Sequence, residues 1–392
     1  MKRHTLAVLC AFAVAGIAAG SGFAKPDKPP KVVGQVYVND NAAGTNTIAG
    51  FDRHADGSLT PMAGSPFAAG GAGTGHGTAS QGALALSDDG RYLLAVDAGS
   101  NQISVLRIEH DGSLEQADGS PVSSGGVNPV SIAVSDKLVY VANQGPGTNP
   151  GDANYTGFKL KGNGELDPIP DSTVALPSDA VPGQVLFNAD GSQLIGTRIG
   201  SSAIDSFSVG KDGVLVAAPG SPFSAQGFSP PQGYGQLGSV FSPTSLDQLF
   251  VSDAHVASGG PAPGLVSSFS VDPDGVLTPI GSSPVGNDGR ASCWVEISHD
   301  GAFLFVVNTA SATVSSYGIG SDGSLAFLQS TPPGELGGGA EDARLSPDGE
   351  SLWVVQAGAD QVTGFSVSGG TLTPLSSASG PAGATPTGIV VT

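Results

Sequence analysis

A four-residue phrase recurs seven times along the chain: a small polar residue, a glycine, one variable residue and a leucine. The copies begin at Asp56, Asp111, Asn163, Asp212, Asp274, Asp322 and Gly369, and successive glycines lie 47 to 62 residues apart. Asp-Gly and Asn-Gly supply the positive φ values of a tight hairpin, so each copy marks a turn between two strands. A turn that recurs about every 50 residues in a strand-rich chain predicts a β-propeller with one blade per copy.

A second repeated unit precedes each of the later turns. It consists of an alternating strand such as Ala83–Leu86, a turn at Ser87–Gly90 and an apolar strand at Tyr92–Val96. Equivalent units begin near Ser131, Gln184, Ser239, Trp294 and Ala343. Each blade then holds four strands, because a third strand and an outer strand follow every unit. We predict an all-β fold of seven four-stranded blades.

The two ends of the chain complete one blade. Val36–Val38 reads as a central strand with no inner strand before it, and Thr387–Val391 reads as an inner strand with no blade after it. Pairing these segments closes the ring and leaves no free edge between the first and last blades. Residues 32–392 are therefore predicted to form a single propeller domain.

The first 24 residues are predicted to be a signal peptide. Lys2 and Arg3 precede an apolar run over residues 6–19 that is too short to span a bilayer, and Gly22-Phe23-Ala24 fits a cleavage site. A lipid anchor on Cys10 is disfavoured, because this cysteine lies within the apolar run after a bulky leucine. Residues 25–31 then form a linker, and the mature protein is expected in the periplasm or outside the cell.

The charge of the chain limits its partners. It has 15 basic and 34 acidic residues, and loss of Lys2 and Arg3 leaves 13 basic residues and a net charge near −21. Such a surface repels phosphate backbones and anionic membranes, so we expect no nucleic-acid partner and no membrane span.

Cys293 would be the only cysteine of the mature chain, so no internal disulfide can form. We expect a monomer.

The propeller architecture sorts the connections onto two faces. The Asp-Gly turns lie on one face, here called the turn face, and are too short to form a site by themselves. The connections from second to third strand and from blade to blade emerge on the other, the loop face. The long ones are residues 39–47, 66–82, 144–155, 223–238, 253–264 and 332–342. Function on a scaffold commonly lies on such loops, so the site is expected around the loop-face mouth of the central channel.

Familiar catalytic strings are absent from the sequence. It has no Gly-x-Ser-x-Gly elbow, no phosphate loop, no His-Glu-x-x-His and no paired cysteine ligands. Asp272–Gly275 faintly resembles a calcium loop but coincides with one of the seven turns. A quinone-dependent dehydrogenase would need a stacking tryptophan and a carboxylate cluster, whereas both tryptophans lie in predicted strands. We therefore expect neither a metal nor a cofactor.

Polar residues at the loop face are the candidates for a site. The ionisable ones are His76, Asp97, Arg198, Asp253, His255, Asp288, Arg290, Glu341 and Asp342. The candidate catalytic residues are His255 or His76 as general base, and Arg198 or Arg290 for an oxyanion or a substrate carboxylate. The candidate ligand-binding residues are Asp97, Asn143, Asp253, Asn308 and Gln356.

Each catalytic candidate also has a purely structural interpretation. Arg198 would pair with a loop carboxylate, His76 would be an exposed histidine in a glycine-rich loop, and His255 would form a solvated pair with Asp253. Cys293, beside Trp294, would be a small buried filler.

Two segments, Ser87–Ser100 and Ser346–Gln356, resemble the repeat of the seven-bladed lactonase family, and the resemblance extends over the mature chain. This family includes propeller-type 6-phosphogluconolactonases and carboxymuconate-cyclising enzymes. The resemblance implies hydrolysis of a small carbohydrate- or muconate-type lactone. The family places His or Arg-His at inner-strand starts, where this chain has Gly82-Ala83, Gln184-Val185 and Cys293-Trp294. Its Glu and Arg after strand-end asparagines are not matched either, since Thr309 follows Asn308 and Ala357 follows Gln356.

Two hypotheses for function remain open. The first is a lactone hydrolase of the cell envelope, which needs a base to activate water and a donor for the oxyanion. The second is a non-catalytic propeller that binds a glycan, a small molecule or another envelope protein through its loop face.

Overall fold

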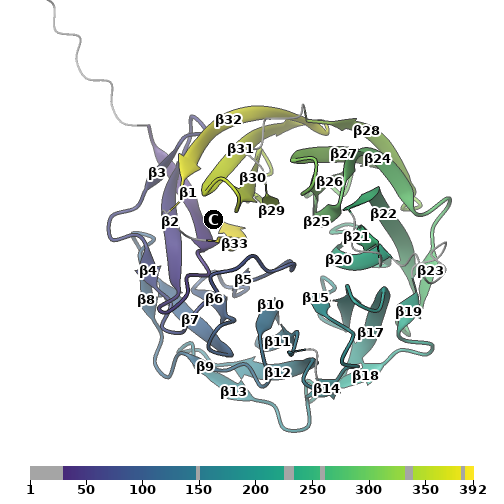
Figure 1. Cartoon of the computed structure of the whole chain (residues 1–392), viewed down its shortest axis with the longest axis horizontal. Helices are drawn as coiled ribbons and strands as arrows, with labels where there is room; N and C mark the ends of the chain where they lie inside the picture. Colours follow the sequence, from purple (N-terminus) through teal and green to yellow (C-terminus); the bar gives the residue numbers. More distant parts are fainter. Residues whose placement is uncertain (1–29, 147–150, 225–233, 257–260, 332–338, 381–384) are drawn as a thin grey trace, which may run out of the picture. The chain divides into compact units, whose positions relative to one another are not determined.

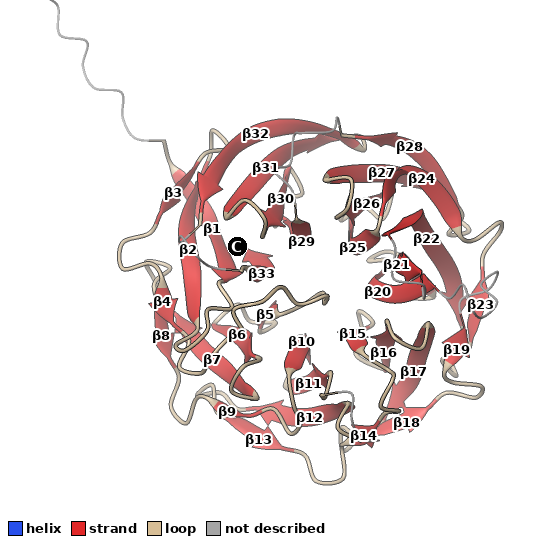
Figure 2. Ribbon diagram, in the orientation of Figure 1, coloured by secondary structure: helices blue, strands red, loops and turns tan. Residues whose placement is uncertain are grey.

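The computed structural model describes residues 30–146, 151–224, 234–256, 261–331, 339–380 and 385–392. Within these ranges the chain forms strands and no helix (Figure 2). Seven antiparallel sheets stand around a central axis (Figure 1). The prediction of an all-β, seven-bladed propeller is confirmed. Lys31–Thr392 form one compact unit.

Each blade has four main strands, counted outward from the channel. Blade one consists of β33 (Thr387–Val391), β1 (Val32–Asn39), β2 (Thr47–His54) and β3 (Leu59–Pro61). Blade two consists of β5 (Leu84–Leu86), β6 (Tyr92–Asp97), β7 (Gln102–Ile108) and β8 (Leu114–Gln116). Blade three consists of β10 (Pro129–Ser135), β11 (Leu138–Asn143), β12 (Asn154–Leu160) and β13 (Leu166–Pro168).

The remaining blades repeat this order. Blade four consists of β15 (Pro182–Phe187), β16 (Gln193–Arg198), β17 (Ala203–Val209) and β18 (Leu215–Ala217). Blade five consists of β20 (Tyr234–Phe241), β21 (Gln248–Val256), β22 (Pro261–Val271) and β23 (Leu277–Pro279). Blade six consists of β25 (Ser292–Ile297), β26 (Phe303–Asn308), β27 (Thr313–Ile319) and β28 (Leu325–Ser330). Blade seven consists of β29 (Ala340–Leu345), β30 (Ser351–Gln356), β31 (Gln361–Ser368) and β32 (Thr371–Ser379).

In five blades a short extra strand continues the outer edge beside the third strand. These strands are β4 (Phe67–Ala68), β9 (Val122–Ser123), β14 (Val174–Ala175), β19 (Phe223–Ser224) and β24 (Val285–Arg290).

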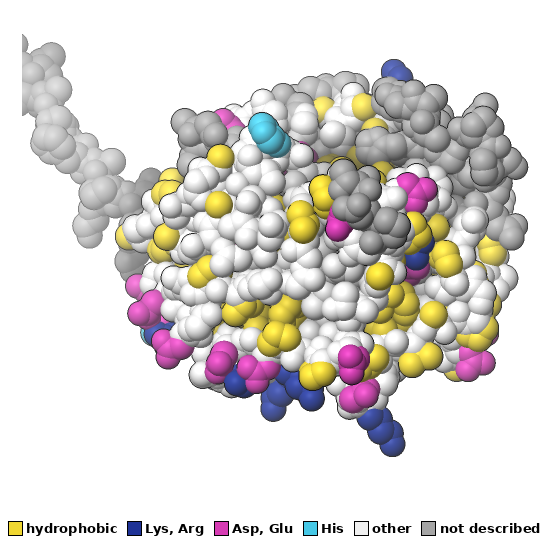
Figure 3. Space-filling view, turned by 60° about the horizontal axis from the view of Figure 1, so that its bottom comes forward, with side chains coloured by type: hydrophobic (Ala, Val, Ile, Leu, Met, Phe, Trp, Pro, Cys, Tyr) yellow, Lys and Arg dark blue, Asp and Glu magenta, His cyan; other side chains and the backbone are white. Residues whose placement is uncertain are grey.

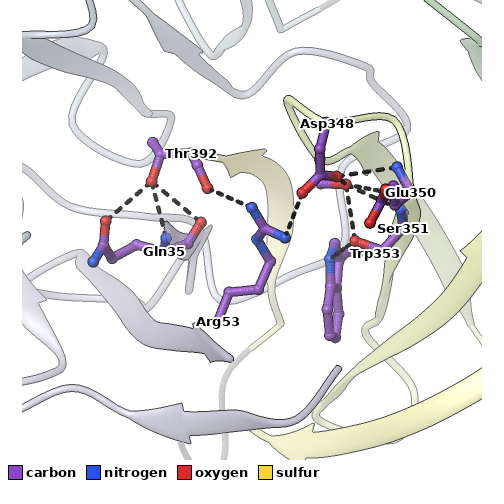
Figure 4. A network of polar contacts seen from close by, with 8 residues as sticks. Gln35, Arg53, Asp348, Glu350, Ser351, Trp353 and Thr392 are labelled. Carbon is purple, nitrogen blue, oxygen red and sulfur yellow. Dashed lines mark hydrogen bonds and ion pairs between the residues drawn. The ribbon is translucent and has the colours of Figure 1, made fainter. Parts of the chain in front are cut away.

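The ring is closed by the C-terminal strand, as the sequence predicts. Strand β33 pairs with β1 in antiparallel register, with Val391 opposite Val36. Thr392 accepts the backbone N–H of Gln35 on its Oγ1 at 2.9 Å, and Arg53 reaches from β2 to Asp348 of blade seven at 3.2 Å (Figure 4). These contacts join the first and last blades directly, so closure does not depend on strand pairing alone.

The hydrophobic core lies between the blades. One cluster joins Leu94 and Val105 of blade two to Val141 and Phe158 of blade three, and all four side chains are buried. Because every sheet is apolar on both faces, each blade packs against two neighbours and no blade has a free face.

The connection at 253–264, expected as a loop, is largely a hairpin, because β21 extends to Val256 and β22 begins at Pro261. Residues 1–24 lie outside the described residues, so the signal peptide stays a prediction. Among the described residues, none belongs to a helix long and apolar enough to cross a membrane. Cys293 is buried, as predicted.

Exposed charges gather at the short turns. Arg91 pairs with Asp89 at 2.7 Å and Lys161 with Asp167 at 2.7 Å, both across turn-face connections. Figure 3 shows charged side chains of both signs along the lower edge of the ring in that view. Exposed pairs of this kind contribute little to stability, and we assign them to solubility.

Candidate functional site

Six of the predicted site residues occupy one repeated position. At the loop-face end of the second strand, every blade carries a buried polar residue, and we call this set the strand-end ring. In blade five the second strand runs three residues further, but the position is equivalent in register. The ring consists of Asn39, Asp97, Asn143, Arg198, Asp253, Asn308 and Gln356.

The two aspartates of the strand-end ring are fully buried and hydrogen-bonded. Asp97 accepts from Asn46 at 2.8 Å and from Ser104 at 2.5 Å. Asp253 accepts from Gln236 at 2.9 Å and from Ser267 at 2.8 Å. Burial raises the pKa of Asp97, and it raises that of Asp253 to about 7. Both carboxyls bind neighbouring strands and loops rather than facing solvent.

Arg198 forms a buried ion pair inside its own blade. Its Nε and Nη2 atoms donate to the two carboxylate oxygens of Asp205 on β17, at 2.6 and 2.5 Å. Tyr155 of the preceding blade donates to the same carboxylate at 2.9 Å, and burial followed by the Asp205 charge raises the pKa of Tyr155. Arg198 thus pairs with a carboxylate, as its structural interpretation expects, but this carboxylate belongs to Asp205 on strand β17 and not to a loop.

The amides of the strand-end ring are also engaged. Asn143 donates to Asn154 at 2.9 Å, Asn308 donates to Ser315 at 2.7 Å, and Gln356 donates to Thr363. In each case the partner lies on the third strand of the same blade. A ligand role for these residues stays a prediction, since their bonds are made within the fold.

The other predicted residues are scattered over the loop face. His76 is exposed in its glycine-rich loop, where its carbonyl accepts from Asn41 at 2.6 Å. Asp288 and Arg290 are exposed on β24. The backbone of His255 lies in β21, but its side chain lies outside the described residues. The described side chains therefore do not bring His76, Arg198 and Arg290 together in one set of contacts.

One loop-face connection crosses the axis of the ring. The segment Thr78–Gly82, which precedes β5, runs to the middle of the propeller (Figure 1). Gln81 is buried and binds Val295 on the opposite side, donating to its carbonyl at 2.8 Å and accepting its N–H at 3.0 Å. Trp294 donates to the Ser80 carbonyl at 2.6 Å. Among the described residues, this segment lies across the loop-face end of the channel.

A cavity of about 520 Å³ occupies the channel beneath the crossing segment. Gln81 and Gly82 line its inner end. Asp88, Asn188 and Pro347, from turns between first and second strands, line the other end, so the cavity reaches the turn face. The concave space of the channel thus lies on the opposite side from the mouth that the sequence favoured.

Seven residues at one repeat position form the wall of this channel, and we call them the channel girdle. Each girdle residue lies on the first strand of its blade. Its partner on the second strand comes three positions before the strand-end residue of that blade. Five are apolar and two are charged: Val391, Ala85, Ala133, Leu186 and Val240, then Glu296 and Arg344. All except Glu296 line the cavity. The two charged members belong to neighbouring blades, six and seven.

Glu296 and Arg344 form an ion pair beside the cavity. Arg344 Nη1 lies 3.2 Å from Glu296 Oε2, and the Glu296 side chain is 11 % exposed while that of Arg344 is 34 % exposed. Burial raises the pKa of Glu296 to about 7, although Arg344 acts in the opposite direction. Asp342, two residues before Arg344, is buried, and its pKa is raised by burial as well.

One buried nitrogen atom of this pair makes no hydrogen bond. Arg344 Nε has no hydrogen-bond partner among the described residues, whereas Glu296 Oε2 is held by the ion pair with Arg344 Nη1 at 3.2 Å. Buried polar groups without partners are rare in folded proteins, and each one asks for an explanation such as a bound molecule. Arg344 also lines the cavity, and its side chain is 34 % exposed, so this member of the pair is accessible from the channel.

Glu341, the neighbour of Asp342, lies apart from the channel girdle. Its carboxyl lies against Gly77 of the loop-face connection, and burial raises its pKa to about 8. Among the described residues, no cluster of three His, Cys, Asp or Glu side chains is arranged to hold a metal ion.

Sequence reasoning placed Asp342 and Glu341 on the loop face but missed Glu296 and Arg344. A signal for both was present in the repeat. When the blades are aligned on the turn that begins at Ser87, Asn188, Ser298 or Ser346, the residue two places earlier is apolar except in blades six and seven. A charge where the fold uses an aliphatic side chain points to a role beyond packing.

A family model described as "Lactonase, 7-bladed beta-propeller" matches residues 44–149 and 244–391, more than half of the chain. The chain belongs to this lactonase family. The resemblance predicted from the repeat is therefore confirmed at the level of the family.

Solved structures share the fold with these lactonase-family blades. A Bacteroides uniformis protein described as a 6-phosphogluconolactonase has a TM-score of 0.72 at 18% identity, covering 92% of this chain and 99% of the other. The periplasmic gluconolactonase PpgL of Pseudomonas aeruginosa has a TM-score of 0.70 at 18% identity, covering 91% and 98%. At such identities the likeness shows the fold alone. A comparison with curated protein sequences finds no match.

Proposed function

We propose that this propeller hydrolyses a lactone in its central channel, with Glu296 as general base and Arg344 as the cation that stabilises the oxyanion. The observation that carries the proposal is the channel girdle, in which only these two members depart from aliphatic side chains. They are also paired, beside a cavity, in a member of the lactonase family.

The reaction requires only these two side chains and water. Ionised Glu296 takes a proton from a water molecule, whose oxygen attacks the lactone carbonyl carbon. The carbonyl oxygen becomes an oxyanion, which the Arg344 guanidinium stabilises. When the ring C–O bond breaks, the leaving alkoxide takes the proton from Glu296, and the product is a hydroxy acid.

The electrostatics of the pair suit both roles. A base is most effective when its pKa lies near the working pH, and burial raises that of Glu296 to about 7. The Arg344 charge is held by its neighbours, since Glu296 and Asp342 raise its pKa against the effect of burial. The Arg344 side chain lines the cavity and is 34 % exposed, so the guanidinium can donate to a substrate oxygen.

The proposal extends to the location of the protein. The apolar N-terminal run and the Gly22-Phe23-Ala24 site support export, which would place the enzyme in the periplasm or outside the cell. A gluconolactonase with the same fold is periplasmic in Pseudomonas aeruginosa, which agrees with this placement.

The test is lactone hydrolysis by the mature chain, followed by pH-stat titration of the released acid. Glu296→Gln keeps the shape of the side chain but cannot take the proton, so kcat/KM should fall by about 10²-fold or more. Glu341→Gln is the matched control, because it removes another buried carboxyl on the neighbouring β29 strand. It should leave kcat/KM within about two-fold of the parent.

The pH profile adds an independent readout. The kcat/KM of the parent should rise as Glu296 ionises through about pH 7, and Glu296→Gln should lose that dependence. Equal activity of Glu296→Gln and the parent would refute the assignment of the base. A parent without turnover on any lactone would refute catalysis and favour the binding propeller.

A further inference from the structure

The charge and polarity of the channel indicate which lactones fit it. Resting on the function proposed above, we infer that the substrate is an uncharged lactone with an apolar substituent, and neither a phosphorylated nor a heavily hydroxylated one. Three properties of the cavity wall carry this inference: its charge balance, its free hydrogen-bonding groups and the side chains of the channel girdle.

The cavity offers no excess of positive charge for a phosphate. Its ionisable lining residues are Arg344 and Asp88, one of each sign. The Arg344 charge is already opposed by Glu296 at 3.2 Å and by Asp342. A phosphate monoester carries a charge of about −1.5 to −2 near pH 7, and burying it without cationic partners is strongly unfavourable. A net charge of −19 for the chain adds to the repulsion.

The polar groups in the wall are mostly committed to the protein. Gln81 uses both amide atoms on Val295, and Gln184 accepts from Ser239 through its amide oxygen. Asn188 likewise donates to Ser192 and accepts from Gln193. A sugar lactone brings several hydroxyls, and each hydroxyl that loses water without finding a partner weakens binding. Few side-chain groups of the wall are therefore left to pair with the several hydroxyls of a sugar lactone.

The aliphatic part of the girdle provides the complementary surface. Ala85, Leu186 and Val240 are partly exposed and line the cavity, while Glu296 and Arg344 occupy the neighbouring blades six and seven. A lactone ring at the ion pair would thus direct its substituent toward apolar side chains. Burial of an alkyl group there is favourable in proportion to the area removed from water.

The experiment compares three lactones on the mature protein. They are δ-octalactone, which is neutral and alkyl-substituted, glucono-1,5-lactone, which is neutral and hydroxylated, and 6-phosphoglucono-1,5-lactone, which is anionic. We expect kcat/KM to fall in that order, with at least about ten-fold between the first and the last. The acid released is measured at one pH and ionic strength, with subtraction of spontaneous hydrolysis.

A substitution in the girdle tests the physical cause. Ala85→Lys adds a cation to the wall without touching Glu296 or Arg344, and should raise kcat/KM for the phosphorylated lactone by about ten-fold. Ala85→Leu, the matched control, adds bulk without charge and should not raise it. Thermal unfolding of both variants verifies that they remain folded, and the ordering in the parent stands independently of them.

The outcomes separate the two proposals. Faster hydrolysis of the phosphorylated or the hydroxylated lactone than of δ-octalactone would overturn the substrate class while leaving lactone hydrolysis intact. Absence of turnover on all three, together with none on other lactones, would overturn the proposed function itself.

Discussion

The strand-end ring and the channel girdle are both sets of seven repeat-equivalent residues, yet they differ in one respect. The strand-end ring is polar in all seven blades, and its members bond to adjacent strands and loops. The channel girdle is apolar in five blades and charged in two. Polarity that recurs in every repeat is explained by the architecture alone, without a ligand, because each second strand ends at a loop and needs its last polar groups satisfied.

Polarity that occurs in only some repeats has a different meaning. The five aliphatic girdle positions show that the fold does not require a charge there. Burying the Glu296–Arg344 ion pair costs desolvation free energy that a pair of apolar side chains would not cost. Natural sequences retain such unfavourable features chiefly at functional sites. The contrast between the two rings therefore supports the proposal that Glu296 and Arg344 form the site.

The largest effect is expected when Arg198 of the strand-end ring loses its partner Asp205. Asp205→Ala leaves the Arg198 guanidinium buried without its partner, which should lower the free energy of unfolding by about 3–5 kcal/mol. Urea denaturation measures the change, and kcat/KM of the folded fraction should be unaffected. Asp212→Ala, in an exposed turn of the same blade, is the control and should cost under about 1 kcal/mol. Equal stability of the two variants would mean that Arg198 is not an architectural residue.

The second prediction converts the girdle to its apolar form. Glu296→Leu combined with Arg344→Leu should give a folded protein whose stability is unchanged or raised by about 1–4 kcal/mol. Its kcat/KM should fall by about 10²–10³-fold, since base and oxyanion donor are both lost. Thermal unfolding and lactone hydrolysis are measured on the same preparation. A double variant that fails to fold would show that the Glu296–Arg344 pair is needed for folding, as the strand-end ring is, and would contradict the difference drawn between the two rings.

The third prediction concerns pH. Burial raises the pKa of Asp40, Asp253 and Glu296 to about 7 and that of Glu341 to about 8. Between about pH 4 and these values the folded protein binds more protons than the unfolded chain, so stability falls as the pH rises. We expect the free energy of unfolding to be lower at pH 8 than at pH 5 by at least about 2 kcal/mol, since one such carboxyl alone contributes about that much over this interval.

Asp253→Asn tests the contribution of the strand-end ring to this dependence. It removes one titrating carboxyl from the strand-end ring and should flatten the profile of unfolding free energy against pH. Stability that instead rises between pH 5 and pH 8 in the parent would contradict the assignment of these carboxyls as protonated in the fold.

The smallest effect is expected at the loop face. His76 is exposed, and His76→Gln should change the free energy of unfolding by less than about 0.5 kcal/mol. It should also leave kcat/KM within about two-fold of the parent, because the proposed base is Glu296. A large loss of activity in this variant would place the site at the loop-face mouth, with His76 as the general base.

The architecture follows from the sequence because its determinants are local. Asp-Gly turns, alternating strands and apolar central strands are each set within a few residues, and seven copies of such a unit fix the number of blades. Even the closure of the ring could be predicted. Val36–Val38 reads as a second strand without a first strand, and Thr387–Val391 reads as a first strand without a second.

The site depends on contacts between residues far apart in the chain. Gln81 binds Val295 at a separation of 214 residues and thereby crosses the loop-face end of the channel. The pairing of Glu296 with Arg344 likewise depends on which blades stand side by side. The pairing of Arg198 with Asp205 spans only seven residues and depends on the register of β16 and β17. By itself the sequence determined the blades, their order and their closure through local turn and strand preferences. Only the tertiary structure decided which polar side chains are consumed by the fold and which remain available in the channel, because burial and partnership depend on the packing of all seven blades.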